Sequence, residues 1–151
     1  MENMYKMPNE CIELSGEKCS FLETRIEKAC KLAEVNEKFY LATNAMWSYR
    51  LNFMPAIKIS VIWSGIEALF MIDHNIKNTI ATVSSRFIYG NDDKIEDIKN
   101  LYKEARCKAT HEYQNGTYDL YKKSNELLYK LILKCIDEGH TPDVNYILTI
   151  F

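Results

Sequence analysis

Glycine and proline are scarce in this chain of 151 residues, which contains 5 glycines and 3 prolines. Few turn markers are therefore present, a composition that favours long helices over a sheet of many strands. The sequence has no apolar run of about 18 residues, so we expect no membrane span. A Gly-rich phosphate loop, a Gly-x-Ser-x-Gly motif and an EF-hand loop are also missing, which argues against the protein classes that use them.

The 5 cysteines form no Cys-x2-Cys pair and are widely spaced along the chain. A structural zinc site needs closely spaced ligands, so we expect neither a metal nor another cofactor. An odd number of isolated thiols indicates a reducing compartment, and we predict a cytoplasmic protein. The segment from Met1 to Cys19 mixes acidic, polar and apolar residues, a pattern unlike that of a secretory signal peptide.

A large excess of positive charge is lacking as well, because the formal net charge is -2 and the isoelectric point is about 5.9. Nothing in the overall charge indicates a nucleic-acid ligand, although a small site on an acidic chain can carry local positive charge. Aromatic residues make up 12% of the chain and could stack on bases. Most of them fall on helical faces that we predict to be buried, so core packing is the favoured interpretation.

Hydrophobic residues make up 47% of the chain, and they recur at helical spacing along most of it. This pattern predicts an all-α, single-domain antiparallel bundle of five to six helices over residues 18–151, after an irregular leader at residues 1–17. The predicted helices span residues 20–35, 39–51, 56–71, 76–89, 94–111 and 117–138. Pro55 suits the first turn of the third helix, and Gly90 and Gly139 suit helix ends. The third helix is apolar on both sides, which predicts a central position.

The segment from Arg106 to His111 forms an Arg-x4-His motif near the end of the predicted helix over residues 94–111. Cleavage of RNA by its own 2'-hydroxyl needs a base, an acid and a group that stabilises charge on the phosphate. Imidazole can serve as base or acid, and a guanidinium can hold phosphate oxygens. On an ideal helix the two side chains point about 140° apart. The helix must loosen, or a second subunit must contribute, for both to reach one site.

Further motifs surround the Arg-x4-His motif. Residues 63–70 read Trp-Ser-Gly-Ile-Glu-Ala-Leu-Phe, a later helix bears Ser85-Arg86, and Leu101-Tyr102 precedes the motif. This set, over roughly residues 37–136, resembles the HEPN superfamily, and most closely its Apea-like HEPN domains. The resemblance implies a HEPN-like bundle of four to five helices, often a homodimer. Active members are metal-independent endoribonucleases whose Arg-x4-6-His motifs combine across the dimer.

By this resemblance, Arg106 holds phosphate and His111 acts as acid or base, with no metal. Two neighbours depart from the family pattern, since Cys107 stands where a polar residue is common and Glu112 stands where Gly is common. Glu112 adds negative charge beside the predicted phosphate site. Cys107 and Lys108 are supporting residues in this prediction, and Lys108 is expected to pair with a glutamate one helical turn away.

Glu67 lies at the edge of the apolar face of the third predicted helix. Its functional interpretation is a carboxylate that orients Arg106 or His111. Its structural interpretation, which we favour, is an internal ion pair with a partner such as Arg86, because a charge inside a bundle needs a partner.

Three interpretations of function remain open on the sequence alone. The first is an endoribonuclease in stress or phage defence, which cuts single-stranded or looped RNA, forms a homodimer, and acts on neither DNA nor membranes. The second is a catalytically inactive HEPN-like module that dimerises or binds protein or RNA. The third is an unrelated helical bundle in which Arg106 and His111 are ordinary surface residues.

Overall fold

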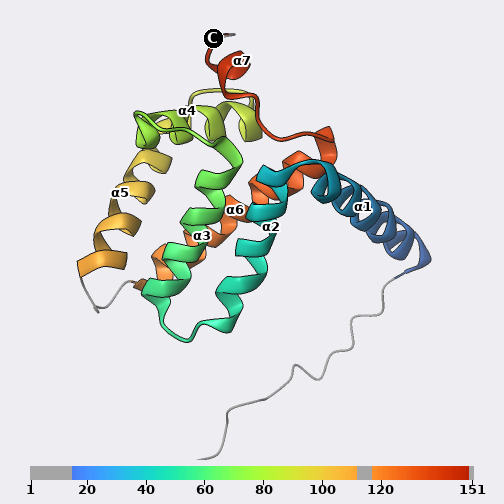
Figure 1. Cartoon of the computed structure of the whole chain (residues 1–151), viewed down its shortest axis with the longest axis horizontal. Helices are drawn as coiled ribbons and strands as arrows, with labels where there is room; N and C mark the ends of the chain where they lie inside the picture. Colours follow the sequence, from blue (N-terminus) through green and yellow to red (C-terminus); the bar gives the residue numbers. More distant parts are fainter. Residues whose placement is uncertain (1–14, 112–116, 150–151) are drawn as a thin grey trace, which may run out of the picture.

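The computed structural model describes residues 15–111 and 117–149, with the side chains of residues 107–111 outside that description. Within these residues the protein has no strand and consists of seven α-helices and one short 3-10 helix (Figure 1). In chain order the elements are α1 (Gly16–Val35), α2 (Glu37–Ser48), η1 (Tyr49–Leu51), α3 (Pro55–Phe70), α4 (Ile76–Tyr89), α5 (Ile95–His111), α6 (Thr117–Glu138) and α7 (Val144–Thr149). The prediction of an all-α helical bundle is confirmed.

The six predicted helices correspond to α1 through α6, with small differences at their ends. Helix α1 begins at Gly16 rather than near Ser20, because the Ser15 hydroxyl accepts a hydrogen bond from the Lys18 backbone at 3.4 Å and caps the first turn. Asn36 separates α1 from α2. Its side-chain oxygen accepts from the Phe39 backbone N–H at 3.1 Å, which starts the second helix.

The seventh helix, α7, was not predicted, since it has only six residues and the last predicted helix ends at residue 138. The Asp143 side chain accepts a hydrogen bond from the Tyr146 backbone N–H at 3.0 Å, which caps this short helix. An Asp before a short apolar segment was the available sequence signal.

The predicted helix-end signals act as expected at three positions. Pro55 occupies the first turn of α3, where its missing N–H costs nothing. Gly90 and Gly139 follow α4 and α6 in the left-handed conformation, with φ of 72° and 76°. Met71 adopts the same conformation after α3 with φ of 45°, although it carries a side chain.

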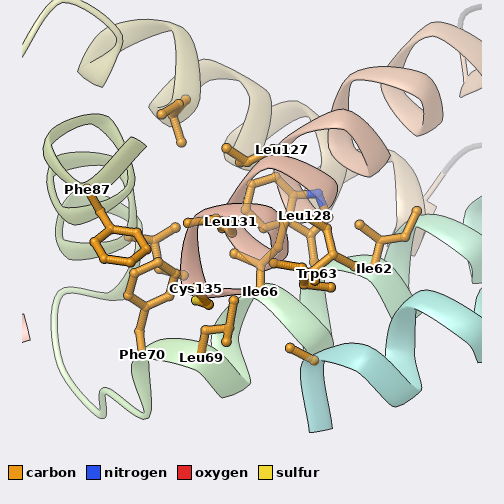
Figure 2. Close-up of a cluster of buried hydrophobic side chains, with 14 of the residues drawn as sticks. Ile62, Trp63, Ile66, Leu69, Phe70, Phe87, Leu127, Leu128, Leu131 and Cys135 are labelled. Atoms are coloured by element: carbon orange, nitrogen blue, oxygen red, sulfur yellow. The ribbon is translucent and has the colours of Figure 1, made fainter. Parts of the chain in front are cut away.

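Helix α3 lies at the centre of the bundle and packs against α2, α5 and α6 (Figure 1). Figure 2 shows side chains of α3 meeting those of α6 across the core, with Phe87 of α4 at one end. The largest fully buried side chains come mainly from these helices: Trp63, Phe39, Phe70, Ile59, Ile62, Ile66, Leu69, Ile80, Leu128, Leu131, Val83 and Cys135. The predicted central position of the third helix is therefore confirmed. Among the described helices, none is both long and apolar enough to span a membrane.

The α2–α3 contact depends on one glycine. A Cβ atom built at Gly65 would lie 2.5 Å from the Ala45 Cβ and 3.4 Å from the Ala42 carbonyl oxygen. No side chain fits there without separating the two helices, so this contact requires glycine in α3 and alanines in α2.

We expect Gly65→Ala to lower the free energy of unfolding by about 1 to 3 kcal/mol, because the added methyl group overpacks the helix contact. Urea unfolding followed by circular dichroism measures the change. Gly16→Ala is the matched control, since a Cβ there meets nothing within 4 Å. Equal stability of the two variants would contradict the packing of α2 on α3.

Candidate functional site

The site begins with the buried indole of Trp63 on α3. Its Nε1–H donates a hydrogen bond of 3.0 Å to the hydroxyl of Ser124 on α6, and both residues are buried. The ring of Tyr102 on α5 meets the indole edge to face, with centroids 5.1 Å apart and an interplanar angle of 88°. A buried indole N–H needs a partner, so this contact fixes the ring orientation and, through it, the position of Tyr102.

Tyr102 and Arg106 on α5 converge on a single carboxylate. The Arg106 guanidinium Nη2 forms an ion pair with Oε1 of Glu67, which lies one turn after Trp63 on α3. The Tyr102 hydroxyl donates to the same oxygen at 3.4 Å. The guanidinium carbon also lies 5.7 Å from the centre of the Tyr102 ring, within the range of a cation–π contact. Arg106 is therefore held by a charge, a hydroxyl and a ring.

The guanidinium of Arg106 stays half exposed while it is held in this way. The Arg106 side chain is 51% exposed, and that of Glu67 is 26% exposed. Partial burial works to lower the pKa of Arg106, but the hydrogen bonds to Glu67 and Tyr102 and the charge of Glu67 outweigh it, so the pKa is raised. The side chain therefore remains a cation at all physiological pH values and can meet an anion from solvent.

The favoured interpretation of Glu67 named the wrong partner for its ion pair. Glu67 pairs with Arg106, which was the functional alternative, and Arg86 lies in a different contact. The Arg86 Nε donates to Asp92 at 2.6 Å and its Nη1 donates to the Ile147 carbonyl at 3.2 Å, so Arg86 ties the α4–α5 turn to α7. The hydrogen bonding that Arg86 donates to Asp92 raises the pKa of Arg86 and lowers the pKa of Asp92.

The other predicted site residues follow Arg106 on α5. His111 is the last residue of α5. The side chains of Cys107, Lys108 and His111 lie outside the described residues, as does Glu112. Five residues of helix correspond to a rise of about 7.5 Å between the Arg106 and His111 Cα atoms. That the His111 imidazole reaches the same site as the Arg106 guanidinium stays a prediction.

The two described histidines and the buried thiol stand apart from this site. His74 is exposed in the turn before α4, and His140 contacts the neighbouring Thr141 carbonyl at 2.9 Å in an exposed loop. Burial raises the pKa of the Cys135 thiol to about 12, so it is an inert core residue. Among the described side chains, no three His, Cys, Asp or Glu residues are grouped closely enough to hold a metal ion.

A groove of about 570 Å³ runs between α5 and α6, beside the site. Its lining combines apolar residues with charged residues of both signs. The lining residues are Tyr89, Lys94, Asp97, Ile98, Asn100, Leu101, Glu104, Leu120, Lys123, Glu126, Leu127 and Lys130. Arg106 and Glu67 do not line this groove.

Comparisons of the chain with protein-family models, with curated proteins and with solved structures find no match in any of the three. The site must therefore be interpreted from its own geometry.

Two supporting residues, Trp63 and Tyr102, were missed as parts of the site. The available signal was spacing, because Trp63 precedes Glu67 by four residues and Tyr102 precedes Arg106 by four. Residues four apart share a helix face, so two packed helices bring all four side chains together.

The prediction that most aromatic side chains are buried is wrong. Of the 15 aromatic residues that the structure describes, eight are exposed. They are Phe21, Tyr40, Trp47, Phe53, Tyr89, Tyr118, Tyr129 and Tyr146. Helical periodicity placed several of these on apolar faces that extend past the edge of the core.

We expect a double-mutant cycle of Glu67→Gln and Arg106→Gln to give a coupling energy of about 0.5 to 1 kcal/mol, since the pair is partly exposed. Urea unfolding of the wild type, both single variants and the double variant supplies the four free energies. The pair formed by Arg25 and Asp137, more than a hundred residues apart in sequence, is a matched control for a surface contact between helices. Strictly additive effects of the two substitutions would show that Glu67 does not hold Arg106 in solution.

Proposed function

We propose that this protein is a metal-independent endoribonuclease that acts as a homodimer, with Arg106 and His111 in its active site. The carrying observation is the half-exposed guanidinium of Arg106, which Glu67 and Tyr102 hold in one place. A positioned cation that still meets solvent suits the stabilisation of charge on a phosphodiester.

The reaction needs only groups that the chain and its substrate supply. A base removes the proton of the 2'-hydroxyl, whose oxygen then attacks the adjacent phosphorus. The 5'-oxygen leaves as it takes a proton from an acid, which yields a 2',3'-cyclic phosphate and a 5'-hydroxyl. The imidazole of His111 serves as base or acid, and Arg106 holds the non-bridging oxygens. DNA lacks the attacking hydroxyl, so we expect it to be left intact.

A second copy of the chain completes the site in this proposal. Arg106 and His111 point about 140° apart on an ideal helix, so contributions from two protomers remove a difficulty of a single chain. The contact with the partner would have to form on the α5 side of the molecule, because α1 lies on the opposite side of the bundle (Figure 1).

The second candidate is a catalytically inactive HEPN-like module that dimerises or binds protein or RNA. The observation that favours it is the charge of Glu67, which offsets that of Arg106 within a single chain. A guanidinium has five N–H donors, however, and one carboxylate oxygen does not by itself prevent contact with a phosphate. We place either activity in the cytoplasm, where the three described cysteines, all free thiols, would remain reduced.

We expect the purified protein to cut single-stranded RNA in the presence of EDTA. His111→Ala should slow cutting by about 100- to 10,000-fold, because it removes a general acid or base. Arg106→Ala should slow it by about 100- to 1,000-fold, because it removes a donor to the charged phosphate. Gel analysis of a labelled RNA measures both effects.

Two matched controls are His140→Ala and Arg25→Ala, which remove the same side-chain types outside the site. Both should cut at the wild-type rate. Intact RNA with all proteins, together with a stable dimer in sedimentation, would support the inactive module instead. Equal cutting by His111→Ala and the wild type would exclude the proposed mechanism.

A further inference from the structure

A second surface lies around the turn between α2 and α3, and it exposes aromatic side chains to solvent. Trp47 at the end of α2 is 68% exposed, Phe53 in the turn is 98% exposed, and Tyr118 at the start of α6 is 69% exposed. We call these residues, together with Arg50 and Lys58, the turn surface. Aromatic rings bury large apolar areas when they find a partner, so their exposure here marks a binding surface.

The two cations of the turn surface lie over rings. The guanidinium carbon of Arg50 is 5.1 Å from the ring centre of Trp47, and the Lys58 ammonium is 5.4 Å from the ring centre of Tyr121. The Tyr121 ring lies 5.9 Å from that of Tyr118. Tyr49 joins the two groups, because its ring centre lies 5.8 Å from that of Tyr121 and 5.9 Å from the Arg50 guanidinium carbon. Positive charge and aromatic faces are thus interleaved within a single area.

The turn surface is also locally basic on an acidic protein. Residues 38–66 contain no Asp or Glu, although they include Arg50 and Lys58, while the whole chain has a net charge of -2. Asp119 is the nearest acidic residue along α6, but it lies about 100° around the helix from Tyr118. Within residues 38–66, an anionic partner would therefore meet these two cations and no carboxylate.

We propose that the turn surface binds single-stranded RNA. Unpaired bases would stack on Trp47, Phe53 and Tyr118, since every base has a π-face that an aromatic ring can meet. The phosphates between them would contact Arg50 and Lys58. Charge complementarity favours this partner, because each cation lies beside a ring, as a phosphate lies beside its base.

The turn surface is positioned to hold the substrate of the proposed nuclease. Only this substrate role rests on the proposed function, whereas RNA binding itself does not. Thr117 follows His111 by six residues, so their Cα atoms are at most about 21 Å apart. The α2–α3 turn, the end of α5 and the start of α6 all lie at the same end of the molecule, at the bottom of Figure 1. An RNA strand on the turn surface would run toward the end of α5 that carries His111.

The test measures binding separately from cleavage. A labelled single-stranded RNA of about 12 nucleotides, with methylated 2'-hydroxyls that cannot attack phosphorus, is titrated with the full chain and followed by fluorescence anisotropy. We expect Trp47→Ala and Phe53→Ala each to weaken binding by about 5- to 150-fold. Arg50→Ala should also reduce the slope of log affinity against log salt by about 0.7. Phe53→Ala is a safe variant for the fold, because its side chain is almost fully exposed.

Tyr146→Ala is the matched control, since Tyr146 is 65% exposed on α7, at the opposite end of the molecule (Figure 1). It should bind the RNA like the wild type. Equal loss with Tyr146→Ala, or no loss with the turn-surface variants, would overturn the proposal. So would variants that keep RNA affinity but lose binding to vesicles of anionic lipid or lose self-association. RNA binding without cleavage would instead retain the turn surface and remove the nuclease proposal.

Discussion

The indole of Trp63 connects the three helices on which the candidate site depends. Its N–H donates to Ser124 on α6, and its ring edge meets Tyr102 on α5, while Trp63 itself lies on the central helix α3. A fully buried tryptophan can take few orientations, because both its volume and its single donor must be matched. Trp63 and Tyr102 thus pack α3 against α5, and Glu67 and Arg106 follow them by four residues on their own helices.

Electrostatics divide the surface into two areas with different chemistry. Near Tyr102, the Glu67 carboxylate holds the half-exposed guanidinium of Arg106, so a cation that meets solvent is kept in place. Around the α2–α3 turn, cations lie over exposed rings with no carboxylate in the same stretch of chain. The first area suits precise placement of a phosphate, and the second suits tolerant contact with a flexible strand. The net charge of -2 reveals neither area, because it is summed over the whole chain.

The helices could be predicted from the sequence because local signals mark them. Pro55, Gly90 and Gly139 mark helix ends through backbone chemistry that tertiary contacts do not alter. The partner of Glu67 could not be predicted in the same way. Helical spacing tells which residues share a face, but not which helix lies opposite, so Arg86 was favoured although Arg106 is the partner. Likewise, an apolar face does not reveal how far the neighbouring helix covers it, which is why most aromatic side chains were expected inside.

The chemical ends of the cut RNA test the central claim most directly, since they report which oxygen attacked the phosphorus. The measurement is mass spectrometry of the fragments that the wild-type protein produces from single-stranded RNA in EDTA. The account predicts fragments with a 2',3'-cyclic phosphate and a 5'-hydroxyl, because the substrate supplies its own nucleophile. Fragments with a 3'-hydroxyl and a 5'-phosphate would contradict it, because water would then have attacked.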